Sequence, residues 1–174
     1  MAPLRAADSP AWHWHLFAAE HFGAGAFAVA GGYLVRVLLP PVEEQPLAPE
    51  PADPDTQAFA AELAACFREG RPAQALPHRF TGVAPFHAEV LAACLRIPPG
   101  SVWSYARLAA EAERPSAVRA AARAMAVNPL PLVVPCHRVV RSGGGLGGFG
   151  GGIEMKRHLL DMEARFRERS GRTE

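Results

Sequence analysis

The chain has 174 residues, 49% of them apolar, and a formal net charge of +1. This length and composition suffice for one or two small domains with apolar cores. The net charge is nearly balanced, so bulk charge alone does not indicate a nucleic-acid partner. No apolar run reaches the length of a membrane-spanning helix, so we expect no membrane partner.

The distribution of charge along the chain is uneven. Residues 114–141 contain five arginines and no acidic residue, whereas residues 43–55 contain five acidic residues and no basic one. This asymmetry predicts a basic face on the later segment and a solvated acidic loop on the earlier one.

The three cysteines, Cys66, Cys94 and Cys136, are an odd number without paired spacing. This argues against a disulfide framework and for a reducing compartment. The N-terminus has no basic segment followed by an apolar one, so we predict no signal peptide. We expect the protein in the cytosol, or on the nucleoid, of a bacterial-type cell.

The first 55 residues predict a small β-structure and a loop. Residues 12–15 read Trp-His-Trp-His and His21 follows, but partners at metal-ligand spacing are missing, so we predict a strand or helix start and no metal site. Gly31-Gly32, between two apolar runs at residues 26–30 and 33–39, favours a β-hairpin with a two-residue turn. The next segment, residues 40–55, contains six prolines and five acidic residues and predicts a loop.

Two helices are predicted before residue 100. An Asp55-Thr56 pair suited to capping begins the first, residues 55–68, and Gly70 ends it. The second spans residues 86–95 and is stopped by Pro98-Pro99-Gly100. Residues at helical spacing form the apolar faces: Phe59, Leu63, Cys66 and Phe67 in the first helix, and Phe86, Val90, Leu91, Cys94 and Leu95 in the second.

Residues 104–127 predict a helix-turn-helix. Ser104 can cap the first helix, and Ser116, in the turn, can cap a second, alanine-rich helix that runs to the end of this segment. Arg119 and Arg123 are four residues apart and therefore share one face of the second helix. Like charges so placed repel slightly, which favours a bound anion, although an ordinary solvated helix face has the same pattern.

Residues 131–140 read Pro-Leu-Val-Val-Pro-Cys-His-Arg-Val-Val. The valine pairs on either side predict a buried, extended backbone, which places the thiol of Cys136 inside the fold. A structural cysteine needs no histidine beside it, whereas a nucleophilic cysteine needs help to reach the thiolate. Cys136 and His137 are therefore a candidate nucleophile and base, with a chance pair in the core as the alternative.

Residues 143–152 contain eight glycines, interrupted by Leu146 and Phe149. The Gly-Lys-Ser/Thr of a phosphate-binding loop is absent, so we predict a hinged loop that closes over a pocket. The last helix, residues 153–169, places Glu163 within an apolar pattern. A buried carboxylate there needs a partner, so we expect Glu163 to be paired.

Pro-Cys-His-Arg-Val-Val at residues 135–140, with Ile97-Pro98-Pro99-Gly100 at the matching spacing, resembles the signature of the O6-alkylguanine-DNA alkyltransferases (methylated-DNA–protein-cysteine methyltransferases). The resemblance covers roughly residues 82–166. It implies that O6-alkylguanine is extruded from double-stranded DNA, bound from the minor groove, and that the alkyl group moves irreversibly to Cys136 in a single turnover. It implies a monomer without a cofactor and leaves O4-alkylthymine open as a second substrate.

The resemblance implies a role for each site position. Cys136 would accept the alkyl group, His137 would withdraw its proton through a water, and Glu163 would orient the imidazole. On this basis we expect Glu163→Leu to impair the reaction without greatly reducing stability. Asn128 would order the site. The DNA-binding positions would be Ser104, Tyr105, Arg119 and Arg123. The pocket for the flipped guanine would be lined by Met125, Pro131, Val139, Phe149 and Gly150.

Within this set, Arg119 would take the place of the extruded base in the helical stack, and Tyr105 would push on the phosphate of the target nucleotide. Arg123 would contact a phosphate. Where the family often has tyrosine in the glycine loop, this chain has Phe149. Losing one hydrogen bond to the guanine ring in this way would cost roughly 0.5–1.5 kcal/mol.

The predicted fold class is α/β (α+β). We expect a small β-hairpin-plus-helix N-terminal domain at residues 1–80 with its loop at 40–55, a mainly helical, winged-helix-like C-terminal domain at 81–169, and a tail at 170–174. Three alternatives stay open: a lesion sensor that accepts no alkyl group, another Cys-His enzyme such as a hydrolase, and a plain helix-turn-helix regulator. A sensor would lack the cysteine, a hydrolase would turn over, and a regulator would leave the Cys-His pair unexplained.

Overall fold

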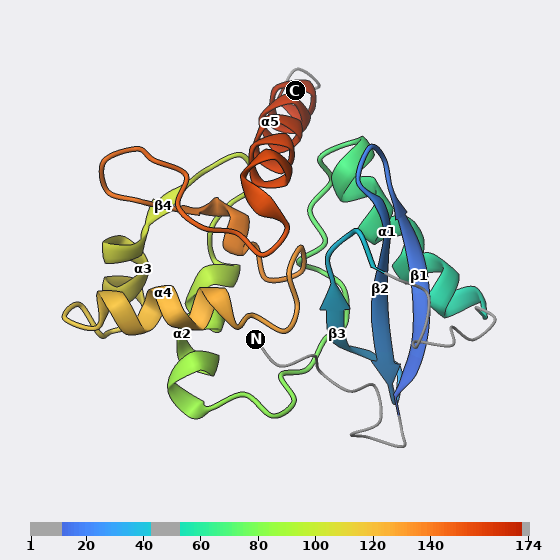
Figure 1. Cartoon of the computed structure of the whole chain (residues 1–174), viewed down its shortest axis with the longest axis horizontal. Helices are drawn as coiled ribbons and strands as arrows, with labels where there is room; N and C mark the ends of the chain where they lie inside the picture. The colour runs from blue at the N-terminus through green and yellow to red at the C-terminus, as the bar shows by residue number, and fades with distance from the viewer. Residues whose placement is uncertain (1–11, 43–52, 172–174) are drawn as a thin grey trace.

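The computed structural model describes residues 12–42 and 53–171. A three-stranded antiparallel sheet lies at one side and a group of short helices at the other, with the last helix, α5 (Gly152–Ser170), between them (Figure 1). The predicted fold class is confirmed, because the N-terminal part is built on this sheet and the C-terminal part is mainly helical.

The sheet contains β1 (His13–Ala19), β2 (Gly23–Ala30) and β3 (Tyr33–Leu38), paired in chain order. The predicted hairpin is confirmed: Gly31 and Gly32 form its turn with φ of +56° and +78°, values that side chains disfavour. The Trp-His-Trp-His segment is a strand rather than a helix start. Among the described residues, no group of three or more histidine, cysteine or acidic side chains could hold a metal ion.

Helix α1 (Pro54–Arg68) covers one face of the sheet. It begins at Asp53, whose Oδ1 accepts a hydrogen bond from Thr56 N–H at 2.8 Å. The predicted cap at Asp55 is therefore wrong. Proline suits the first helical position, so Pro54 makes the residue before it the cap. The rings that pack between sheet and helix are Phe17, Phe27, Phe59 and Phe67.

The helical part contains α2 (Pro85–Leu95), α3 (Tyr105–Glu111) and α4 (Val118–Ala126). Ser104 caps α3 as predicted, since its Oγ accepts from Arg107 N–H at 3.1 Å. The predicted cap at Ser116 is wrong: Ala117 occupies the cap position without a side-chain bond. Its N–H donates to the Arg114 carbonyl at 2.9 Å, which closes a turn over residues 115–116 and delays the helix.

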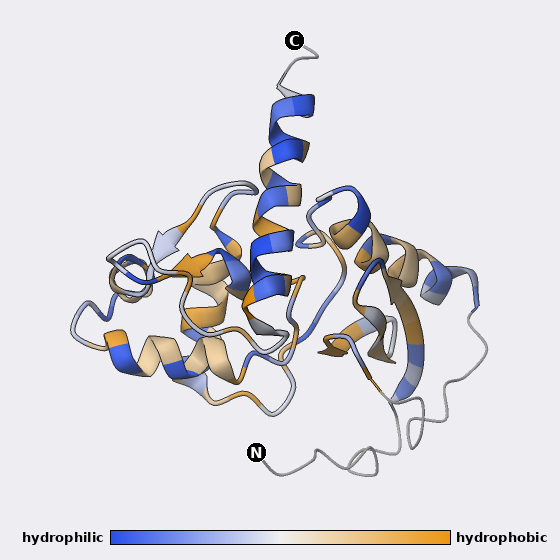
Figure 2. Ribbon diagram, turned by 45° about the horizontal axis from the view of Figure 1, so that its top comes forward, coloured by the Kyte–Doolittle hydropathy of each residue, from blue (hydrophilic) through white to orange (hydrophobic). Residues whose placement is uncertain are grey.

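Helix α4 packs closely on its neighbours because Ala121 and Ala124 are fully buried. Arg119 and Arg123 are exposed on its other side. Figure 2 shows that α5 is polar over much of its length, and no helix of the described residues is both long and apolar enough to cross a membrane.

Candidate active site

Cys136 begins a single turn of 3-10 helix, η1 (Cys136–Arg138), which leads into β5 (Val139–Val140). The neighbouring valines are buried, as predicted, except that Val140 is half-buried. The predicted extended backbone holds after the cysteine, where β5 pairs with β4 (Trp103–Ser104). It fails before the cysteine, because Leu132 has a φ of +75° and turns the chain.

Asn128 holds this turn together. Its Nδ2 donates to the Val134 carbonyl at 3.0 Å, and its Oδ1 accepts from Leu130 N–H at 3.0 Å. From the sheet, Val37 N–H of β3 donates to the Pro129 carbonyl at 2.9 Å. The segment that presents the thiol is therefore fixed by its own asparagine and by the edge of the N-terminal sheet.

The thiol of Cys136 lies in a buried environment, with 8% of the residue exposed. Burial raises its pKa, while a hydrogen bond from the Asn128 side chain and the positive charge of Lys156 act in the opposite direction. The Lys156 ammonium is held nearby by the Val139 carbonyl, at 2.6 Å from Nζ. The thiol needs a base to become a thiolate, because burial dominates.

His137 is the base closest in sequence to the thiol and is 2% exposed. Its Nε2 lies 2.8 Å from Oε1 of Glu163, so the expected burial and pairing of Glu163 are both present. A proton on Nε2 leaves Nδ1 as the acceptor. Nδ1 is buried and makes no hydrogen bond within the described residues. Burial lowers the pKa of His137, which keeps the imidazole neutral and able to take a proton.

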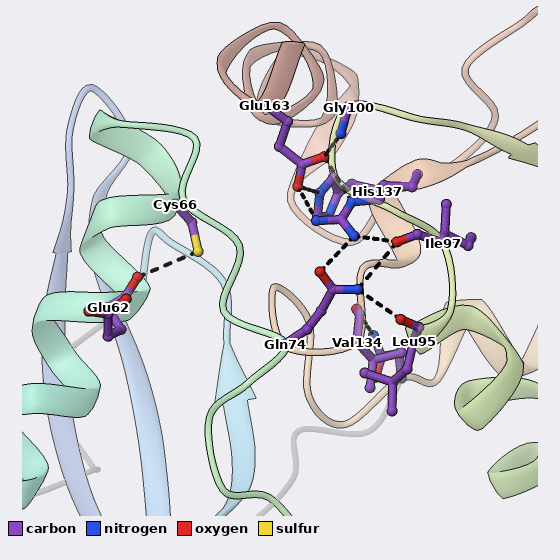
Figure 3. A network of polar contacts seen from close by, with 11 residues as sticks. Glu62, Cys66, Gln74, Leu95, Ile97, Gly100, Val134, His137 and Glu163 are labelled. Atoms are coloured by element: carbon purple, nitrogen blue, oxygen red, sulfur yellow. Dashed lines mark hydrogen bonds and ion pairs between the residues drawn. The ribbon is translucent and has the colours of Figure 1, made fainter. Parts of the chain in front are cut away.

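Arg138, for which the sequence predicts no role, lies at the centre of the site. This fully buried guanidinium donates from Nε to Oε2 of Glu163 at 2.8 Å and from Nη2 to Oε1 at 2.6 Å. Gly100 N–H also donates to Oε2, at 3.1 Å (Figure 3). An arginine within a run of valines could have indicated this pair, since a buried guanidinium requires a carboxylate.

Four donors therefore surround the Glu163 carboxylate. Burial by itself would raise its pKa, but the hydrogen bonds from His137 and Arg138 outweigh burial and lower the pKa to about 2. The carboxylate is ionised at neutral pH and fixes the position of the imidazole.

Acidification is expected to destabilise the folded protein in two pH windows. The pKa of His137 is lowered from 6.5, so the unfolded chain is protonated first and stability declines below that pH. The pKa of Glu163 is lowered from 4.5 to about 2, so its contribution is complete above pH 4.5 and is lost as pH falls toward 2. Urea unfolding at a series of pH values measures both windows. If Glu163→Gln lost as much unfolding free energy between pH 4.5 and 2 as the wild-type protein, the window assigned to Glu163 would be contradicted.

A cavity of about 390 Å³ opens beside the thiol. A neighbouring cavity of about 490 Å³ shares part of its wall and reaches β3 of the N-terminal sheet. The first cavity is lined by Tyr105, Ala122, Met125, Ala126, Cys136, Gly148, Phe149 and Gly150. Both volumes fall within the range of small-molecule sites, and the walls are mainly apolar.

Four of the five expected pocket residues line these cavities: Met125, Pro131, Phe149 and Gly150. Val139 does not; its side chain is fully buried, and β5 directs it into the core beside Trp103. Of the expected DNA-binding residues, Tyr105 lines the first cavity, and Arg119 and Arg123 are exposed on α4. The Ser104 hydroxyl is used as the cap of α3.

A buried cysteine at a cavity, followed by a paired histidine and glutamate and lying beside a helix-turn-helix, is the arrangement expected of a nucleic-acid-binding protein that uses a cysteine. Residues 85–165 match the family model described as 6-O-methylguanine DNA methyltransferase, DNA binding domain. The crystal structure of Mycobacterium tuberculosis OGT in complex with DNA is similar, with a TM-score of 0.76 and 31% identity over 88% of this chain and 94% of that chain. The chain belongs to the O6-methylguanine-DNA methyltransferase family.

Curated relatives agree. The methylated-DNA–protein-cysteine methyltransferase of Methanothermobacter thermautotrophicus is 45% identical over 48% of this chain and 47% of its own length. The inducible methylated-DNA–protein-cysteine methyltransferase of Bacillus subtilis is 37% identical over 65% of this chain and 63% of its own length. The first of these matches therefore spans about half of the relative, and the second somewhat less than two thirds.

Proposed function

We propose that this protein repairs DNA by direct reversal, moving the alkyl group of an O6-alkylguanine irreversibly to Sγ of Cys136. The observation that carries the proposal is the buried thiol of Cys136 at a cavity, followed in sequence by His137, whose Nε2 is paired with Glu163. The names of the curated relatives, methylated-DNA–protein-cysteine methyltransferases, support the same reaction.

In the transfer step, His137 Nδ1 takes the thiol proton through a water, and the thiolate attacks the alkyl carbon. The bond between that carbon and guanine O6 breaks, and its electron pair stays on the base, which regains a proton to become guanine. Glu163 keeps the imidazole in the tautomer that this transfer needs. The new thioether is stable, so one protein molecule acts once and needs no cofactor.

The alkylated base must leave the duplex, because its O6 is inside the helix. In the cavity at Cys136, the side chains of Met125 and Phe149 provide an apolar wall against which a flipped base can pack. Phe149 also lies edge-on to the His137 ring, with ring centroids 6.3 Å apart, so the same side chain lines the cavity and packs against the imidazole. It lacks the phenolic hydroxyl that the family often has, which we expect to slow but not to abolish transfer.

Helix α4 is the proposed contact with double-stranded DNA. It presents Arg119 and Arg123 to solvent beside the cavity wall formed by Ala122 and Ala126. Small side chains with an inserting arginine suit minor-groove docking, where distortion rather than base sequence is recognised. We further propose that the protein acts as a monomer in a reducing cytosol, where its three cysteines stay thiols.

Arg119 and Arg123 are expected to differ although both are exposed. Arg123→Ala should weaken duplex binding and reduce its salt dependence by about one unit of slope, as for a lost phosphate contact. Arg119→Ala should slow repair of duplex and spare the reaction with free O6-benzylguanine, because only duplex requires a residue that fills the stack. Single-turnover rates on the two substrates measure this, and equal losses in Arg119→Ala would refute the intercalating role.

Titration of the protein against excess methylated duplex tests the proposed function against its alternatives. Direct reversal predicts that repaired guanine stops forming after one equivalent per protein molecule. Continued product formation would indicate a turning-over Cys-His enzyme. Tight binding without any repaired guanine would indicate a lesion sensor.

A further inference from the structure

We propose that Gln74 is a positioning residue for the base: it holds the Arg138 guanidinium against Glu163 and thereby keeps His137 uncharged. The inference rests on the proposed function, in which His137 withdraws the thiol proton. Gln74 lies in the connector between α1 and α2, before the segment 85–165 that matches the family model.

Both ends of the Gln74 carboxamide are engaged. Its Oε1 accepts from Arg138 Nη1 at 2.8 Å, and its Nε2 donates to the carbonyls of Leu95 at 2.8 Å and Ile97 at 3.3 Å. Figure 3 shows the Gln74 side chain beside Leu95, the last residue of α2, and Ile97. The orientation of the amide follows from these partners, because a flipped amide would turn its oxygen toward two carbonyls and its NH₂ toward a cation.

Gln74 completes the coordination of a cation that has no access to water. Arg138 is fully buried, and its Nη1 donates to the Ile97 carbonyl at 2.6 Å as well as to Gln74. Its other nitrogens bind both oxygens of Glu163. The planar guanidinium is thus held from two sides. Without Gln74, Nη1 keeps only the Ile97 carbonyl, so the guanidinium is held less firmly in the plane of the carboxylate.

The charge state of His137 depends on this arrangement. Arg138 neutralises Glu163, which would otherwise favour the imidazolium, and it also repels a proton on the ring directly. Burial, Arg138 and Lys156 lower the pKa of His137, whereas Glu163 raises it. Among the described residues, the charged groups that act on the ring are Glu163 and Lys156 of α5 and Arg138 of its own turn, and the ring of Phe149 in the glycine loop lies against it.

The connector that carries Gln74 is fixed at both ends. At Gly70, where φ is +72°, a Cβ atom would overlap the backbone of α5, so only glycine allows this close approach. At the other end, Leu34 of β3 donates to the Pro77 carbonyl at 2.9 Å and accepts from Arg79 N–H at 2.9 Å. The N-terminal sheet and α1 therefore determine where Gln74 meets the guanidinium.

The test compares Gln74→Met with Gln57→Met in the full chain. Methionine keeps the size of glutamine and removes its hydrogen bonds, and Gln57 supplies the same change on the exposed surface of α1. The ring nitrogens of His137, assigned with His137→Asn, are titrated by ¹⁵N NMR. We expect Gln74→Met to raise the pH midpoint of the His137 titration by about half a pH unit or more. At pH values below that midpoint, the transfer rate should fall roughly threefold relative to the wild-type protein. Gln57→Met should match the wild-type protein.

An unchanged His137 midpoint in folded Gln74→Met would overturn the proposal even if the rate fell, because a merely structural role lowers the unfolding temperature without altering the titration. If Gln74→Met does not fold, Gln74→Ala carries the same test, since a smaller side chain admits water to the freed carbonyls. Failure of the proposed function is a separate result: the wild-type protein would then accept no methyl group, while the titrations of both variants could still be compared.

Discussion

Replacing Cys136 with alanine is expected to abolish alkyl acceptance completely while leaving duplex binding largely intact. The thiol is the nucleophile of the proposed reaction, whereas Arg119 and Arg123, the proposed DNA contacts, are exposed on α4. Removing one sulfur from a buried position leaves a small void and a modest loss of stability. Binding of O6-methylguanine duplex and transfer of a labelled methyl group, measured on the same preparation, separate the two effects.

Cys66→Ala and Cys94→Ala are the matched controls for this prediction. Both thiols are buried, and burial raises the pKa of Cys66 to about 12 and that of Cys94 well above 9.0. Neither thiol lines the cavity at Cys136. Each control should therefore retain transfer. Labelled methyl on either of these cysteines in the wild-type protein would contradict the assignment of the nucleophile.

Glu163→Leu is expected to cost about 3–5 kcal/mol of folding free energy, because it leaves the guanidinium of Arg138 buried without its carboxylate. Arg138 is fully buried, and within the described residues Glu163 is the only carboxylate to which it donates hydrogen bonds. Its remaining partners are the Gln74 amide and the Ile97 carbonyl. The structure thus replaces the expectation drawn from the sequence, which had assigned Glu163 a part in reactivity alone. Urea unfolding at neutral pH measures the loss.

Glu163→Gln separates the charge of Glu163 from its volume. The amide can still accept hydrogen bonds, but it no longer balances Arg138 or orients a neutral His137 as strongly, so we expect a smaller loss of stability than in Glu163→Leu and slower transfer. The pH profile of Cys136 alkylation by a small substrate is the measurement. If the pH profile, the transfer rate and the stability of Glu163→Gln all equal those of the wild-type protein, Glu163 has no role in the reaction or in stability.

Much of the site could be predicted because its residues lie in local motifs. Cys136 and His137 are adjacent, and Glu163 falls within the apolar pattern of a helix, so its burial and need for a partner follow from periodicity. The hairpin turn at Gly31-Gly32 and the cap at Ser104 are equally local, and both were confirmed.

The remaining parts depend on tertiary contacts. Arg138 bonds Glu163, 25 residues away, and Gln74, 64 residues away, and no pattern in the sequence links these positions. Val139 could have faced either the cavity or the core, and its pairing with Trp103 directs it to the core. Which serine or aspartate caps a helix also depended on turn geometry that alternation and periodicity do not specify.

Intact-mass spectrometry of the wild-type protein after incubation with O6-methylguanine duplex, followed by peptide mapping, tests the central claim most directly. Direct reversal predicts that the protein gains the mass of one methyl group, that the peptide carrying Cys136 holds it, and that the duplex contains guanine in place of the lesion. Repaired duplex with an unmodified protein, or a methyl group on any other residue, would contradict the account.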